Sequence, residues 1–235
     1  MQLTARLRTA TARLRRDRSG VAMMEFAMAM PPVLFVVLYG LEVGNLALVN
    51  LKVSQVALNL ADNMSRVGLD TGLPVVQFRE VDVNDALAGA RVFGQTWQLT
   101  EHGRVTVSSL YHDGAIQRIQ WQRCLGKMRG ADWESHYGTT SINAGSDASD
   151  ANKGTPAPTG MGPVGAKVNA PPNTGVVFVE VNYKYQPLLS LSWIGQRSRI
   201  AYTASYMVRD RRDFSQIHNP APQAQRYTCD KFTTE

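Results

Sequence analysis

The fold of this chain depends first on residues 20–51, which read GVAMMEFAMAMPPVLFVVLYGLEVGNLALVNL. Between residues 21 and 49 the only charged side chains are those of Glu25 and Glu42. As a helix this stretch would reach roughly 44 Å, and the hydrocarbon core of a bilayer is about 30 Å thick. The sequence therefore predicts a transmembrane helix over residues 21–50.

The residues before this helix are strongly basic. Residues 1–20 contain six arginines and one acid, Asp17, and so carry +5 of the chain's net charge of +6. The remaining residues hold 19 basic and 18 acidic side chains. A charge confined to one short arm argues against a nucleic-acid-binding surface and predicts a cytoplasmic N-terminus. Residues 51–235 would then lie in the bacterial periplasm, with the helix in contact with inner-membrane lipid.

Glu25 needs an explanation, because an acid inside a membrane helix costs about 3 kcal/mol on insertion scales. A secretory signal peptide has an apolar region of about 7–15 residues and an A-x-A-like cleavage site, and residues 39–44 (YGLEVG) offer no such site. An ordinary membrane anchor fits the length and leaves Glu25 at the cytoplasmic interface, facing headgroups. The alternative is that Glu25 has a function inside the membrane.

The spacing around Glu25 favours this alternative. Residues 19–26, SGVAMMEF, place Gly20 five residues before Glu25, where the basic arm meets the apolar helix. This arrangement resembles the type IV prepilin signal, and its G-x-x-x-x-E-F form is most similar to the tight-adherence (Tad/Flp) branch. With prolines at 31 and 32 and a G-x-x-x-G at 40–44, residues 20–51 resemble the TadE-like family.

The resemblance implies a function for several residues of the helix. A prepilin peptidase would remove the leader, residues 1–20, by cutting between Gly20 and Val21. Glu25, next to Phe26, would then neutralise the new amino terminus of a neighbouring subunit. Pro31 removes a backbone donor in mid-helix, and the small residues Gly40 and Gly44 would let another helix approach closely. The alternative for these last three residues is that Gly and Pro are simply common in membrane helices.

The helix is predicted to continue beyond the membrane, to a length of about 45 residues. After residue 50, apolar side chains recur at spacings of three or four, as in an amphipathic helix, and Gly68 is a stop signal. These positions are Val53, Val56, Leu60, Met64 and Val67. A second, short helix is expected over residues 85–94, capped by Asp82 or Asn84, with Leu87 and Val92 facing inward.

The rest of the chain predicts about four strands, mostly antiparallel, laid against the outer half of the long helix. Alternating or β-branched segments mark the strands, and Asp113-Gly114 marks a hairpin turn between the first two. These segments are 105–110, 115–123, 176–185 and 199–208, and an apolar stretch at 187–195 is expected to pack on the sheet. Residues 138–175 hold seven glycines and five prolines, which predicts a flexible surface loop. The predicted fold is α+β and pilin-like.

The two cysteines, Cys124 and Cys229, are too few for a disulfide-built fold and lack the spacing of metal ligands. The periplasm is oxidising, so a Cys124–Cys229 disulfide is expected there. Such a bridge would join the aperiodic C-terminal tail to the end of the hairpin. Two unpaired thiols are the alternative.

No enzyme motif is found: the sequence contains no G-x-S-x-G, Walker A or G-x-G-x-x-G segment, and its four histidines lack metal spacing. We expect no catalytic residue, metal or cofactor. The leading hypothesis is a minor pilin or pseudopilin-like subunit of a tight-adherence type IV pilus or its assembly machine. Its partners would be a prepilin peptidase, other pilin subunits and the assembly platform. The alternative is an uncleaved single-span inner-membrane protein with a periplasmic binding or sensor module.

Overall fold

The computed structural model describes residues 19–68, 72, 75–189 and 199–234. The described residues fall into two compact units, one of residues 19–47 with 187–189 and one containing the rest. Most of the expected leader and of the apolar stretch predicted at 187–195 lie outside the described residues.

The predicted long helix is confirmed as α2, Ser19–Arg66, a single helix of 48 residues. It continues through Pro31 and Pro32 and ends two residues before Gly68. The guanidinium of Arg212 donates to the carbonyl oxygens of Met64 (3.0 Å) and Val67 (2.6 Å). Carbonyls at a helix C-terminus lack intrahelical donors, so this buried arginine satisfies the end of α2.

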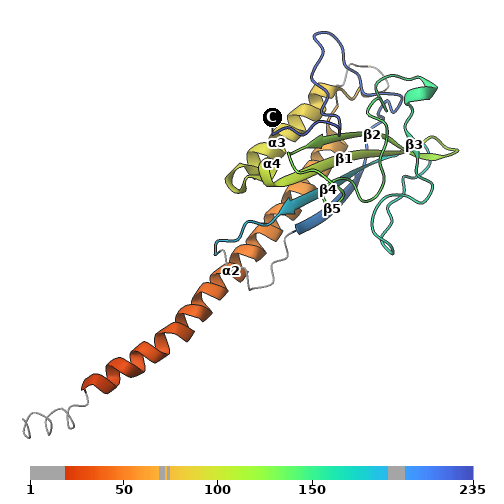
Figure 1. The fold of residues 1–235 in the computed structure, drawn as a ribbon. Coiled ribbons are helices and arrows are strands. Elements are labelled where there is room, and N and C mark those ends of the chain that lie inside the picture. The colour runs from red at the N-terminus through yellow and green to blue at the C-terminus, as the bar shows by residue number, and fades with distance from the viewer. Residues whose placement is uncertain (1–18, 69–71, 73–74, 190–198, 235) are drawn as a thin grey trace, which may run out of the picture. The chain divides into compact units, whose positions relative to one another are not determined.

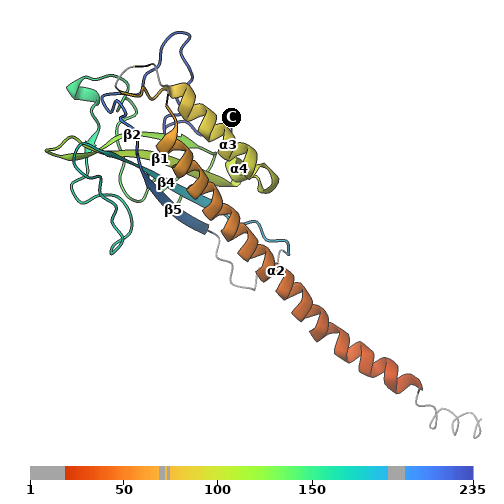
Figure 2. The same cartoon turned by 180° about the vertical axis from the view of Figure 1, so that it is seen from behind.

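The C-terminal part of α2 belongs to the second unit and supplies part of its core. One stripe of the helix is buried there, as the amphipathic spacing predicts, while Val67 is only half-buried. The buried side chains are Val49, Val53, Val56, Ala57, Leu60, Ala61 and Met64. Figure 2 shows this part of α2 and the helix α3 on the same face of the sheet.

The sheet has five antiparallel strands in the order β3-β2-β1-β4-β5 (Figure 1). The strands are β1, Gly103–His112; β2, Gln117–Leu125; β3, Thr155–Pro156; β4, Gly175–Lys184; and β5, Arg199–Met207. Of these, β1, β2, β4 and β5 confirm the four predicted segments to within a few residues. The hairpin turn between β1 and β2 is stabilised by Asp113, whose carboxylate accepts the N–H groups of Ala115 (2.9 Å) and Ile116 (2.8 Å).

The second helix begins earlier than predicted. It is α3, Glu80–Gly94, followed by the 3-10 helix η1, Gln95–Trp97, and by α4, Leu99–His102. Asp82 accepts the backbone N–H of Arg79 (2.9 Å) and its guanidinium (2.7 Å), so it lies inside the first turn and closes a capping box. Leu87 is buried as expected, but Val92 is 65% exposed, which corrects the expected inward orientation.

The two faces of the central strands differ in character. Val105, Val107 and Val179 alternate with Thr106 and Glu180, and all five side chains are buried. The valine face is the one that α3 covers, because Val107 pairs with Arg123, whose guanidinium donates to Glu80 of α3, and Figure 2 shows the C-terminal part of α2 on the same face. On the polar face, Glu180 accepts from the segment between β2 and β4, and Arg104 donates to the C-terminal tail.

Residues 138–175, expected to be a flexible surface loop, cover part of the sheet. This segment contributes β3, the 3-10 helix η2 (Asp150–Asn152), and the buried side chains of Ala144, Met161 and Ala170. Met161 and Ala170 pack with apolar side chains of the sheet, which would otherwise face water: Leu110, Ile119, Val176 and Phe178. Gly154, at φ +89°, permits the approach of β3, because a Cβ there would lie 2.2 Å from the Ile119 carbonyl oxygen.

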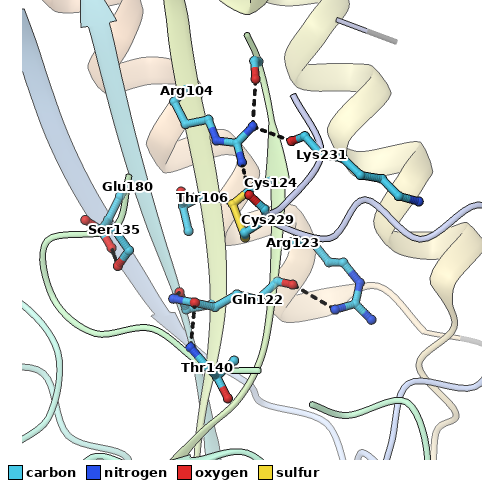
Figure 3. Close-up of a disulfide and its surroundings, with 12 residues drawn as sticks. Arg104, Thr106, Gln122, Arg123, Cys124, Ser135, Thr140, Glu180, Cys229 and Lys231 are labelled. Atoms are coloured by element: carbon cyan, nitrogen blue, oxygen red, sulfur yellow. Dashed lines mark hydrogen bonds between the residues drawn. A yellow bond between two sulfur atoms is a disulfide. The ribbon is translucent and has the colours of Figure 1, made fainter. Parts of the chain in front are cut away.

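The expected Cys124–Cys229 disulfide is formed, with a Cα–Cα distance of 4.8 Å. It joins the tail to β2, and Cys124 N–H also donates to the Tyr227 carbonyl (2.7 Å). Arg104, fully buried, donates to the carbonyls of Cys229 (2.6 Å) and Lys231 (2.7 Å), as Figure 3 shows. Burial lowers the pKa of Arg104 to about 10. The tail is thus held by a covalent bond and by a guanidinium that binds its backbone.

Candidate functional site

The N-terminal half of α2 is the first candidate, because its large apolar side chains are exposed. Every residue from 20 to 41 is exposed, including large side chains such as Phe26, Val36 and Leu41. By length and composition α2 could cross a membrane. Apolar surface of this extent is stable only in contact with lipid or with other apolar surfaces.

The four predicted processing and assembly residues lie within the first eight residues of α2. Gly20 and Val21 are exposed at its start, and Glu25 follows roughly 7 Å further along the axis. Phe26 is next to Glu25 and is also exposed. Glu25 has no hydrogen bond or ion pair with the part of the chain that the structure describes. Within the part of the chain that the structure describes, this carboxylate therefore has no charged partner.

The predicted helix-packing residues also face outward. A Cβ added at Gly40 or Gly44 meets no atom within 4 Å, so packing among the described residues does not require glycine there. Pro31 and Pro32 each lack an N–H, which leaves the carbonyl oxygens of Ala27 and Met28 without their usual intrahelical donors. The apolar half therefore combines two carbonyls that lack their usual intrahelical donor with a glycine surface, nearer its C-terminal end, that another helix could approach.

Glu42 has contacts that the sequence analysis did not predict. Its Oε2 accepts the backbone N–H groups of Leu188 (3.0 Å) and Leu189 (3.1 Å), which follow β4 in the chain. All three residues belong to the same compact unit. The sequence showed Glu42 as a second acid in an otherwise apolar helix. It gave no indication of which residues Glu42 binds.

The second unit contains an open polar cavity of about 440 Å³ beside the start of α3. It is lined mainly by amides and charged groups: Gln77, Glu80, Ser146, Gln216, Ile217, His218, Asn219, Pro220, Gln223 and Arg226. Glu80, nearly fully buried, forms an ion pair with Arg123, and Arg226 Nε lies 3.4 Å away. His218 Nε2 is 2.8 Å from Asp213. These charged groups already have partners within the protein.

Among the described residues, no group of three or more His, Cys, Asp or Glu side chains is placed to hold a metal ion. Searches among protein families, curated proteins and solved structures found no match for this chain. The class of this protein is therefore described by its fold alone. It is an α+β domain with an antiparallel sheet and a long N-terminal helix whose first half is apolar and exposed.

Proposed function

We propose that this chain is a pilin-like structural subunit, a minor pilin or pseudopilin of a tight-adherence type IV pilus or its assembly machine. Its leader is removed by a prepilin peptidase between Gly20 and Val21. The mature subunit waits in the inner membrane and then packs by its apolar helix among other subunits. The domain formed by residues 51–235 lies in the periplasm.

One observation carries this proposal. The apolar half of α2 begins at the Gly20–Val21 bond, is exposed on all sides, and has Glu25 as its only charge before Glu42. A helix that only anchors a domain has no use for that acid in its second turn. A subunit whose helix moves from lipid into a helical assembly can use it to pair with a cation on a neighbour.

The physical basis is the cost of burying a charge. Cleavage before Val21 would create a positively charged amino terminus in the same part of the membrane as Glu25, about 6 Å from it along the helix axis. Each charge alone is expensive in hydrocarbon, and pairing them offsets part of that cost. The requirement for a partner makes the contact between subunits specific, because a misaligned neighbour leaves both charges unpaired.

The alternative function is a membrane-anchored periplasmic binding module. The observation that favours it is the polar cavity near Glu80, whose amides could bind a polar ligand. This alternative requires no cleavage and leaves Glu25 at the cytoplasmic interface.

The mature N-terminus distinguishes the two functions. We predict that membrane-extracted protein from the native cell begins at Val21, as measured by N-terminal sequencing and intact mass. A Gly20→Leu variant should keep its leader, and the fold should tolerate it because a Cβ at Gly20 meets no atom within 4 Å. Wild-type protein that still begins near Met1 would refute the pilin-like proposal and favour the anchored module.

A further inference from the structure

The contact between Glu42 and residues 187–189 suggests a second site of membrane contact. Glu42 is the next charge in α2 after Glu25, and the 21 residues from Val21 to Leu41 reach roughly 31 Å as a helix. That length matches a hydrocarbon core of about 30 Å. If the hydrocarbon core begins at Val21, only the first 21 residues of the predicted segment 21–50 lie within it, and Glu42 lies at the boundary between hydrocarbon and headgroups.

The Glu42 carboxylate fixes the segment 187–189 at this depth. Its Oε2 accepts two successive backbone N–H groups, those of Leu188 and Leu189. Hydrogen bonds to an ionised acceptor are about twice as strong as neutral ones. They also satisfy backbone donors that would be costly to leave unpaired near hydrocarbon.

The side chains of this segment are apolar and partly exposed. Leu188 is 66% exposed, Pro187 and Leu189 are half-buried, and none of the three carries a charge. On the helix, the residues beside Glu42 are Leu41 and Val43, which are also exposed. The apolar surface of α2 and that of residues 187–189 therefore belong to one unit, in which Glu42 joins the two segments by hydrogen bonds.

We propose that residues 187–189 form a second membrane contact, in which Leu188 inserts into the lipid interface while Glu42 holds the backbone behind it. The occupant of this surface is lipid, because the surface continues the apolar face of the proposed span. This inference rests on the proposed membrane span, and the experiment tests the span separately.

The test uses full-length protein in phosphatidylcholine vesicles, with one fluorophore attached to a new cysteine. Cys124 and Cys229 are paired, so under non-reducing conditions the new thiol alone is labelled. The three variants are Leu188→Cys, Val36→Cys in the middle of the apolar helix, and Val164→Cys, which is 99% exposed on the sheet domain. Each is measured with and without lipids that carry a quenching spin label near the headgroup or near the bilayer centre.

We expect fluorescence loss at position 188 with the shallow quencher, loss at position 36 with the deep quencher, and no loss at position 164. Absence of quenching at 188 with normal quenching at 36 would overturn the inference and leave the span intact. A blue-shifted but unquenched signal at 188 would mean that protein covers the segment, which also overturns it. Absence of quenching at 36 would refute the span itself.

The role of Glu42 has its own test. Glu42→Ala removes the acceptor and should lower the quenching at position 188, while quenching at position 36 stays the same. Unchanged quenching at 188 in the Glu42→Ala protein would refute the role of Glu42 in holding this segment at the membrane.

Discussion

At the scale of single residues, the buried carboxylate of Glu180 has partners that offset part of the cost of its burial. Glu180, 2% exposed on β4, accepts the hydroxyl of Ser135 and the N–H of His136 (2.9 Å). Burial raises the pKa of Glu180 above its ordinary value, and these two hydrogen bonds oppose that rise. The ionised form is therefore less stable in the folded protein than in the unfolded chain.

This shift in pKa predicts a dependence of stability on pH. Because the folded pKa of Glu180 exceeds the ordinary 4.5, its contribution to stability is complete below pH 4.5 and is lost as pH rises through the folded pKa. Glu180→Gln removes the titration and keeps groups that can bond Ser135 and His136. We measure the unfolding free energy of both proteins by urea titration. The value for the variant minus that for wild type should increase as the pH is raised above 4.5. A pH-independent difference for Glu180→Gln would contradict the prediction.

Glu25 is the residue on which the proposed assembly depends. In a Glu25→Ala strain we expect the leader still to be removed, because Gly20 and the apolar helix are intact, while the number of pili falls strongly. Immunoblotting measures the first effect and electron microscopy of the cells the second. Normal piliation in this strain would refute the proposed pairing between Glu25 and a neighbour's amino terminus.

At the scale of elements, α2 is one continuous helix whose two halves lie in different environments. Its first half is exposed and apolar on all sides, whereas its second half buries only one stripe against the sheet. Stability of the domain should therefore depend on that stripe and not on the helix as a whole. Leu60, 2% exposed, and Leu58, 38% exposed, provide a matched pair on the same helix.

We predict that Leu60→Ala lowers the unfolding free energy of the domain by about 2–5 kcal/mol, as expected for a buried leucine that leaves a cavity. Leu58→Ala makes the same change in helix propensity and should cost less than about 1 kcal/mol. Urea unfolding of both full-length variants in the same detergent, followed by tryptophan fluorescence, measures the difference. Equal losses would mean that this stripe is not the core of the folded domain.

At the scale of the whole molecule, the disulfide closes a long part of the chain. Cys124 and Cys229 are 105 residues apart, and in the loop-entropy model such a closure stabilises the folded state by about 4–5 kcal/mol. The double variant Cys124→Ala/Cys229→Ala should unfold at lower urea concentration. It should still fold, since Arg104 binds the tail independently.

Electrophoresis with and without reductant checks that the bond is the cause. Wild-type protein should change mobility on reduction, and the double variant should not. Equal unfolding midpoints for the two proteins would show that the bridge adds nothing to stability beyond the contacts of Arg104.

The sequence by itself determined the elements whose signal is local. The 3.6-residue spacing of apolar side chains predicted the stripe of α2, and β-branched alternation with an Asp-Gly turn predicted β1, β2, β4 and β5. The charge pattern and the Gly20 to Glu25 spacing led to the candidate processing and assembly residues in the same way. These signals lie within a few turns or strands, so a single sequence contains them.

Only the tertiary structure decided the contacts between segments far apart in the chain. The two-residue β3 has no period of its own and exists because β2 offers it an edge. Residues between β2 and β4, which the sequence predicted in part to be a flexible surface loop, bury the polar face of β1 and β4 and satisfy groups such as Glu180. Glu42 and Leu188 are 146 residues apart, and their contact depends on where the chain returns after β4. Composition allowed both free and paired cysteines, and the fold paired them by bringing their Cα atoms within 4.8 Å.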